Sequence, residues 1–219
     1  IRLWLEIVMA QDAAKLKSIL SAAPVVPVII HDDVSTARNL AEALVAGGLP
    51  NLEITLRTPN ALKVMEEMAK VEGAVVGSGT VRRKKDMKAS RDAGCQFMVS
   101  PGAPLALLEA AEDISIPLLP GAATATEAMR LLERGYTAMK FFPAEAMGGA
   151  PVLKAFASPL PDITFCPTGG IDIEKAKIYL GLSNVICVGG SWVIPADAIA
   201  AGDFDRIETL ARQAADLAA

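Results

Sequence analysis

The stretch Val25–Gly48, with the sequence VVPVIIHDDVSTARNLAEALVAGG, contains the unit that decides the fold. It begins with a β-branched apolar run, VVPVII, which is typical of a buried strand. A polar link follows, and then an amphipathic segment in which Ser35 can cap a helix start and Gly47 and Gly48 can supply a left-handed stop. The stretch therefore predicts one strand, one link and one helix.

The same unit recurs along the whole chain. Short apolar runs return at intervals of about 20 to 27 residues, each bounded by Gly, Pro, Asn or Asp. The predicted strands are Val25–Ile30, Leu52–Thr55, Ala74–Val76, Phe97–Val99, Pro117–Leu119, Ala138–Phe142, Ile163–Cys166 and Val185–Val188. The predicted helices that alternate with them are Ser35–Ala46, Pro59–Val71, Lys84–Ala93, Pro104–Ala111, Thr124–Arg134, Pro151–Phe156, Ile173–Leu180 and Phe204–Leu217.

Two α/β architectures alternate strands and helices in this way, a closed barrel and an open doubly wound sheet. A count of eight strands and a length of 219 residues fit a barrel. Polar and Gly-rich residues follow several strands instead of gathering in one phosphate loop near the N-terminus, as a dinucleotide-binding sheet requires. We therefore predict a single-domain (β/α)8 TIM barrel over residues 9–219, with an N-terminal helix over Ala10–Ala22.

The apolar segment Ile1–Val8, IRLWLEIV, precedes the barrel and is interpreted as an extension, since Met9 is positioned like an original start. An exposed patch that includes Trp4 would usually find a partner. Packing of this segment on the barrel is the alternative, and the sequence leaves both open.

Composition excludes several classes of function. The net charge of −4 is spread along the chain, so no basic surface for nucleic acid is expected. No apolar run reaches the roughly 18 residues that span a bilayer, and no signal peptide pattern is found, so we expect a cytoplasmic protein without membrane contact. Cys95, Cys166 and Cys187 are far apart in apolar surroundings and are interpreted as buried thiols in a reducing compartment.

The chain has one histidine, His31, which excludes His-dependent triads and multi-His metal sites within one chain. It follows the first predicted strand and is interpreted as a turn residue near the barrel mouth. We expect no metal and no cofactor.

Lys140 differs from the other lysines because it lies in the apolar strand Ala138-Met-Lys-Phe-Phe-Pro143. Burial favours the neutral amine over the ammonium, and a neutral amine is a nucleophile toward a carbonyl carbon. A lysine that extends from the strand end to solvent is the structural alternative.

Glu53, Thr55 and Arg57 share one face of the second predicted strand, because the side-chain period of a strand is two. A carboxylate inside a barrel can carry protons, and an arginine can hold a substrate carboxylate in a bidentate manner. A purely structural Glu–Arg pair is the alternative.

Gly-rich segments follow three strands: Gly77-Ser-Gly-Thr80, Pro167-Thr-Gly-Gly170 and Gly189-Gly-Ser191. In barrels, the loops after strands seven and eight often bind phosphate through backbone N–H groups, and Thr168 and Ser191 add hydroxyl donors. Tight turns would explain each glycine pair equally well. Together with the amine, the carboxylate and the arginine, these segments suit a phosphorylated keto acid.

The motifs LEITLRT, GSGT, SPG, KFFPAE, CPTGG and VGGSW, in this order and spacing, resemble the 2-keto-3-deoxy-6-phosphogluconate (KDPG) and 4-hydroxy-2-oxoglutarate (KHG) aldolase family from about residue 10 to residue 217. The resemblance implies a trimeric barrel and a metal-independent class I aldolase that releases pyruvate and glyceraldehyde 3-phosphate in the Entner–Doudoroff pathway. It implies Lys140 as the Schiff-base lysine and Glu53 as the general acid/base. The substrate-binding residues it implies are Arg57, Thr80, Phe142, Thr168, Gly169, Gly170, Gly189, Gly190 and Ser191.

Three segments depart from the family pattern: Ile1–Val8, the charged Val81–Asp86 and the bland Ala122–Thr126. They leave open an engineered or surface-altered variant with a further assembly interface. Two alternatives to a KDPG aldolase therefore remain, an aldolase specific for 4-hydroxy-2-oxoglutarate and a barrel that serves mainly as an oligomeric scaffold.

Overall fold

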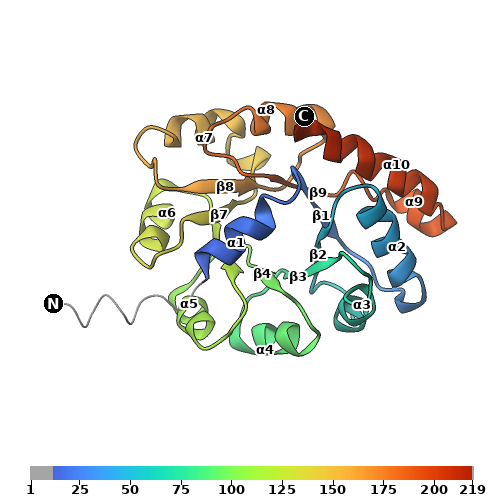
Figure 1. The fold of residues 1–219 in the computed structure, drawn as a ribbon. Coiled ribbons are helices and arrows are strands. Elements are labelled where there is room, and N and C mark those ends of the chain that lie inside the picture. Colours follow the sequence, from blue (N-terminus) through green and yellow to red (C-terminus); the bar gives the residue numbers. More distant parts are fainter. Residues whose placement is uncertain (1–11, 219) are drawn as a thin grey trace.

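The computed structural model describes residues 12–218, and its strands form a parallel barrel with helices around it (Figure 1). The strands are β1 (Val25–Ile29), β2 (Asn51–Thr55), β3 (Val75–Gly79), β4 (Phe97–Val99), β5 (Leu118–Leu119), β6 (Gly121–Ala122), β7 (Ala138–Phe141), β8 (Thr164–Pro167) and β9 (Val188–Gly190).

The strands pair in two groups that join into one ring. Six strands run in the order β5-β4-β3-β2-β1-β9 and three in the order β6-β7-β8, and all pairs are parallel. Pro120 separates β5 from β6, so these are two halves of the fifth barrel strand. Bridges from Phe165 to Val185 and from Thr168 to Gly189 close the ring between β8 and β9. The predicted barrel is thus confirmed.

Every predicted helix is present, with bounds that shift by a few residues. The helices are α1 (Ala13–Leu20), α2 (Val34–Ala46), α3 (Ala61–Met68), α4 (Lys84–Asp92), α5 (Leu105–Glu112), α6 (Ala125–Leu132), α7 (Ala150–Phe156), α8 (Ile173–Leu180), α9 (Ala196–Ala201) and α10 (Phe204–Ala215), with 3-10 turns at Glu145–Met147 and Asp216–Ala218. The cap of α2 is Asp33, not the predicted Ser35, because the Asp33 carboxylate accepts a hydrogen bond from the Ser35 N–H. Helix α9 was not predicted.

Two Gly-rich segments that were predicted as loops are partly strand. Gly77 and Gly79 lie in β3, and Gly189 and Gly190 lie in β9. The glycines are needed there because a Cβ would overlap a neighbouring side chain, such as Thr168 at Gly189 and Trp192 at Gly190. These glycines therefore bring strands and side chains close together at the C-terminal end of the barrel.

Helix α1 lies across the N-terminal end of the barrel (Figure 1). Its Leu16 and Leu20 belong to the interior cluster, which also contains Val26, Phe97, Val99, Leu119, Ala138, Cys166 and Cys187. The Asn51 side chain fixes the helix by donating to the Ile19 carbonyl at 2.5 Å. The observed helix α1, Ala13–Leu20, is shorter than the predicted helix Ala10–Ala22. The predicted extension Ile1–Val8 lies outside the described residues. Among the described residues, α1 closes this end of the barrel interior and leaves the opposite end open.

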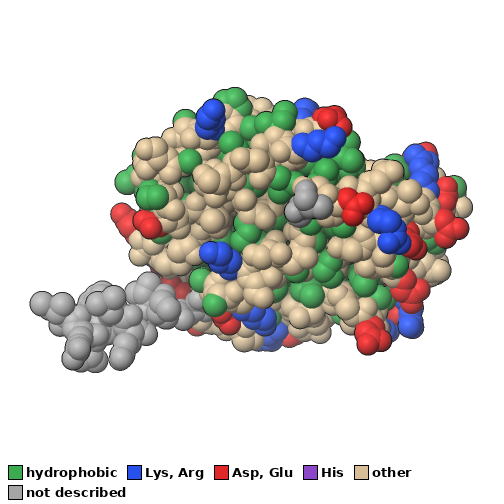
Figure 2. Space-filling model, turned by 45° about the horizontal axis from the view of Figure 1, so that its top comes forward, with side chains coloured by type: hydrophobic (Ala, Val, Ile, Leu, Met, Phe, Trp, Pro, Cys, Tyr) green, Lys and Arg blue, Asp and Glu red, His purple; other side chains and the backbone are tan. Residues whose placement is uncertain are grey.

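Charged side chains of both signs are interspersed on the outer surface, as the right-hand edge of the view in Figure 2 shows. On that side, α2, α9 and α10 carry the ion pairs Arg38–Glu42, Arg206–Asp197 and Arg212–Glu208. Within residues 12–218, no helix combines the length and the apolar character needed to span a membrane.

Candidate active site

Lys140 on β7 points into the barrel, where it meets Glu53 of β2. The Lys140 Nζ lies 3.0 Å from Glu53 Oε1 and 3.3 Å from Oε2, and the two residues are 5% and 2% exposed. The strand neighbours Met139 and Phe141 pack in the outer core, as the period of two requires. A Cβ at Gly79 would overlap the Glu53 carboxylate, so this glycine makes room for the pair. Because Lys140 is buried, the alternative of a lysine that reaches out to solvent is wrong.

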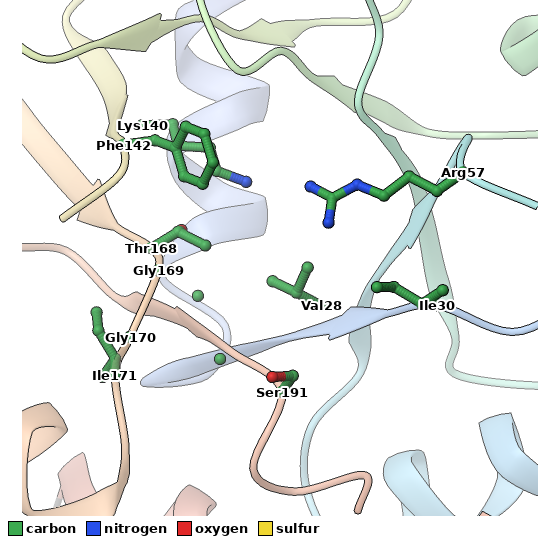
Figure 3. A pocket seen from close by; sticks show the side chains of 12 residues that line it. Val28, Ile30, Arg57, Lys140, Phe142, Thr168, Gly169, Gly170, Ile171 and Ser191 are labelled. Carbon is green, nitrogen blue, oxygen red and sulfur yellow. The ribbon is translucent and has the colours of Figure 1, made fainter. Parts of the chain in front are cut away.

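Arg57 lies beyond the end of β2, and this corrects the prediction that Glu53, Thr55 and Arg57 share one strand face. The strand ends at Thr55, and the Arg57 N–H donates to the Thr55 carbonyl at 2.8 Å in a tight turn. The Arg57 side chain nevertheless extends across the cavity toward Lys140 (Figure 3). Arg57 therefore reaches the cavity from the turn after β2, not from the strand itself.

Thr80 holds Arg57 in place. The Arg57 Nε donates to Thr80 Oγ1 at 2.9 Å, and Thr80 has a φ of 61°, in the left-handed region. A β-branched residue is rare in that region, and strained backbone of this kind is found mainly at functional sites. Thr80 does not line the cavity, so it acts on the cavity through Arg57.

The cavity at the C-terminal mouth has a volume of about 160 Å³. It is bounded by the side chains of β7 and β1, by Arg57 and by the glycine loops after β8 and β9 (Figure 3). Its lining residues are Val28, Ile30, Arg57, Lys140, Phe142, Thr168, Gly169, Gly170, Ile171, Gly189, Gly190 and Ser191. The structure thus brings together most of the predicted site residues, with Glu53 and Thr80 behind them.

Three lining residues were missed by the sequence analysis. Val28 and Ile30 continue the period-two pattern that starts at Val26, so their inward orientation had a signal in the sequence. Ile171 follows the Gly169–Gly170 pair and had no such signal. These three add aliphatic side chains to the cavity lining, while Phe142 contributes a ring whose centroid lies 5.5 Å from the Lys140 Nζ.

The loop after β8 presents unpaired backbone donors. Gly169 and Gly170 have φ values of 108° and 76°, a conformation that favours glycine. Within residues 12–218, the backbone N–H groups of Gly170 and Ser191 donate to no other group. Several backbone N–H groups that converge on one cavity are suited to bind an anion.

His31 and the cysteines lie outside this arrangement. His31 is buried in the link between β1 and α2, where its Nε2 lies 2.9 Å from Thr36 Oγ1 and burial lowers its pKa below the usual value. It was predicted as a turn residue near the barrel mouth; it follows β1 as expected, but the link has no regular turn at this position. Cys95, Cys166 and Cys187 are buried free thiols, as predicted, and burial raises the pKa of Cys95 to about 12. Such thiols are poor nucleophiles.

A buried amine beside a carboxylate at the mouth of a (β/α)8 barrel, with an arginine across the cavity, fits the class I aldolases, enzymes in which a lysine amine forms a Schiff base with a carbonyl substrate. Comparison with known families gives the particular one: residues 16–210 match the KDPG and KHG aldolases. The chain belongs to the KDPG and KHG aldolase family and is a carbon–carbon lyase.

Individual relatives agree with this assignment. The chain is 48% identical over 201 residues to the KHG/KDPG aldolase of Escherichia coli K12, covering 91% of this chain and 94% of that one. A KDPG aldolase from Legionella pneumophila, with pyruvate captured as a covalent carbinolamine intermediate, is similar at a TM-score of 0.88 and 42% identity, covering 91% and 97%. The Zymomonas mobilis enzyme with 3-phosphoglycerate has a TM-score of 0.85 and 45% identity, covering 94% and 96%.

Proposed function

We propose that this protein cleaves 2-keto-3-deoxy-6-phosphogluconate to pyruvate and glyceraldehyde 3-phosphate through a Schiff base on Lys140. The observation that carries the proposal is the buried contact of 3.0 Å between the Lys140 amine and the Glu53 carboxylate at the cavity wall. A carboxylate at that distance can take a proton from the amine or return one to an intermediate. The Legionella relative, with its carbinolamine of pyruvate, supports the same chemistry.

The reaction follows from these two side chains. Once Glu53 has taken a proton from the Lys140 ammonium, the free amine adds to the C2 carbonyl to give a carbinolamine, which loses water to form an iminium ion. Removal of the C4 hydroxyl proton breaks the C3–C4 bond, and the electron pair moves to the iminium nitrogen as an enamine forms. Protonation at C3 and hydrolysis then release pyruvate and free the amine. Glu53 moves the protons, directly or through water.

The pyruvyl end of the substrate is assigned to the side of the cavity that Arg57 closes. A guanidinium binds a carboxylate through two parallel hydrogen bonds, and Thr80 fixes the orientation of Arg57. Phe142 forms the wall beside the Lys140 amine. This orientation places the keto carbon between the amine and the arginine.

The distal phosphate is assigned to the glycine loops. The cavity is lined there by Thr168, Gly169 and Gly170 after β8 and by the adjacent β9 end with Gly189, Gly190 and Ser191, since Thr168 is bridged to Gly189. The unpaired N–H groups there suit a phosphate, and Thr168 and Ser191 add hydroxyl groups. The 3-phosphoglycerate of the Zymomonas relative supports a phosphorylated ligand.

A second substrate, 4-hydroxy-2-oxoglutarate, is favoured by the double activity in the name of the Escherichia coli relative. It carries a carboxylate where the first substrate carries a phosphate group. The ratio of the two kcat/KM values decides between them, since a cradle built for phosphate lowers KM for the phosphorylated substrate. Equal kcat/KM values for the two substrates would contradict the assignment of the glycine loops to a phosphate group.

We further expect a cytoplasmic homotrimer formed by single-domain subunits, as the family resemblance implies. Light scattering distinguishes a trimer from a larger scaffold. The comparisons give no support to an engineered variant, and the segment Ile1–Val8 that suggested a further interface lies outside the described residues.

The central test is borohydride trapping in the presence of pyruvate, followed by mass mapping. A reduced adduct on Lys140 is expected, and its absence would remove the Schiff-base mechanism. Lys140→Met should lose the adduct and all turnover. The matched control, Lys154→Met at an exposed position of α7, should keep both.

A further inference from the structure

Three side chains outside the cavity, Glu145, Lys175 and Tyr179, lie behind the loop that forms one cavity wall. The Lys175 Nζ donates to the Gly170 carbonyl at 2.8 Å. The same ammonium lies 3.4 Å from Glu145 Oε2 and 3.6 Å from Asp172 Oδ2. Lys175 therefore ties the loop to two carboxylates and to the first turn of α8.

Tyr179 completes the group from the buried side of α8. Its hydroxyl donates to Glu145 Oε1 at 2.6 Å, and the residue is 1% exposed. Burial, and then the hydrogen bond and charge of Glu145, raise the pKa of Tyr179 well above its usual value, so the hydroxyl keeps its proton and remains a donor. One oxygen of Glu145 is thus held by Tyr179 while the other faces Lys175.

The loop carbonyls are held outward one after another. The Ala144 N–H donates to the Thr168 carbonyl at 2.8 Å, and the Glu145 N–H donates to the Gly169 carbonyl at 3.2 Å. The third carbonyl, that of Gly170, has the Lys175 ammonium as its donor. Only this third contact depends on a side chain.

Because each peptide unit is planar, these contacts also fix the direction of the loop N–H groups relative to the cavity. In a trans peptide, the N–H of one residue points opposite to the carbonyl of the residue before it, and the loop peptides are trans. Holding the carbonyls of Gly169 and Gly170 outward therefore turns the N–H groups of Gly170 and Ile171 toward the cavity that these residues line (Figure 3). Two glycines in succession cannot hold this geometry alone, because their backbone is the most permissive.

We propose that Glu145, Lys175 and Tyr179 are positioning residues that set the affinity of this enzyme for the phosphate end of its substrate, by fixing the peptide between Gly170 and Ile171. The inference rests on the proposed function. It assigns to these residues no contact with substrate. Since phosphate is held equally in the bound substrate and in the transition state, a displaced loop raises KM and leaves kcat nearly unchanged.

Lys175→Met tests the inference, because methionine keeps the length of the side chain and loses the donor and the charge. We expect KM for the phosphorylated substrate and the inhibition constant of inorganic phosphate to rise about fivefold to tenfold, with kcat within about twofold. Lys175→Arg, which keeps a charged donor, should restore most of the affinity. The matched control is Lys177→Met, because Lys177 lies on the same helix and, among residues 12–218, pairs only with Glu174.

Tyr179→Phe separates positioning from simple charge, since it changes no charge. Positioning predicts that KM for the phosphorylated substrate rises about twofold to fivefold, because Glu145 loses its buried donor. An unchanged KM in Tyr179→Phe would mean that Lys175 acts only through its charge and would overturn the proposal. Equal effects of Lys175→Met and Lys177→Met would overturn it as well.

The parent enzyme distinguishes this failure from failure of the proposed function. If pyruvate is trapped on Lys140 and inorganic phosphate inhibits the parent, the proposed function stands and the variants test the positioning residues. If the parent neither forms the adduct nor responds to phosphate, the proposed function itself is wrong and the inference falls with it. Thermal unfolding of each variant shows whether the fold is retained.

Discussion

At the N-terminal end of the barrel, α1 covers the interior with Leu16 and Leu20, and the cluster beneath it is apolar, with the buried Asn51 side chain bonded to the helix backbone. At the C-terminal end, the same strands carry Lys140 and Glu53, and the loops beyond them surround an open cavity. One end is closed by hydrophobic packing. The other keeps a charged pair, a strained threonine and unpaired backbone donors.

The difference shows how one set of strands serves stability and chemistry. Side chains alternate along each strand, so Ala138 and Lys140 both point inward but at different depths of the barrel. The lower layer is packed like any protein core, while the upper layer pairs a buried ammonium with a carboxylate, which is costly unless the geometry is good. Substitutions at the closed end should therefore change stability, and those at the mouth should change activity.

Leu20→Ala should show the largest effect on stability. Leu20 is 1% exposed, so truncation leaves a cavity and lowers the free energy of unfolding by about 2 to 5 kcal/mol, with kcat unchanged in the folded enzyme. Denaturant unfolding measures the loss. The control Leu105→Ala removes the same atoms from a residue that is 56% exposed and should change stability by less than about 0.5 kcal/mol. Equal losses of unfolding free energy in Leu20→Ala and Leu105→Ala would contradict the view that packing under α1 stabilises the closed end.

Gly79→Ala should show the largest effect on activity among changes that touch no reacting group. The added Cβ would overlap the Glu53 carboxylate and displace it from Lys140, and we expect kcat to fall about tenfold to a hundredfold. Pyruvate release in a coupled assay measures this. Gly181→Ala, where a Cβ meets only ordinary contacts at 3.5 Å, is the control. Full activity of Gly79→Ala would show that Glu53 tolerates displacement.

Thr80→Gly should give the smallest effect. Its stability should stay constant or rise, while its affinity for substrate should fall. Glycine adopts the φ of 61° without strain but adds chain entropy to the unfolded state, so stability should stay constant or rise by up to about 1 kcal/mol. Arg57 loses its hydroxyl partner, and KM should rise severalfold. A clear loss of stability would mean that the Thr80 backbone stores no strain.

Local patterns were sufficient for most of the fold. Each apolar run overlaps a barrel strand, but Val185–Val188 overlaps β9 only at Val188, and β6 lies outside the predicted runs. The helix Ile173–Leu180 was predicted with its observed bounds, and the structure shows that Asp172 caps it. Helix α9 was missed because it is a short helix that follows the eighth strand in place of a loop. The strand character of Gly77, Gly79, Gly189 and Gly190 was missed because glycine has a low strand propensity, and only the neighbouring side chains explain its presence there.

The sequence predicted the reacting side chains of the site better than it predicted the cavity lining and the residues behind it. Lys140 stood out because a charged residue in an apolar strand is rare, and Glu53 followed from the alternation of side chains. Ile171 had no signal, since a residue after two glycines has no periodic neighbour. The contacts of Lys175 with Gly170 and of Tyr179 with Glu145 join separate elements, and nothing in the spacing of these residues predicts them.

The sequence by itself determined the alternation of strands and helices, the barrel, the family and the amine at its centre, because these depend on hydrophobic periodicity and on residue types at short spacing. Only the tertiary structure decided that Lys140 lies 3.0 Å from Glu53, that Arg57 reaches the cavity from a turn, and that α1 closes the other end. Those features depend on closure of the ring. Closure brings residues of distant strands to one end of the barrel, and it is set by packing over the whole chain.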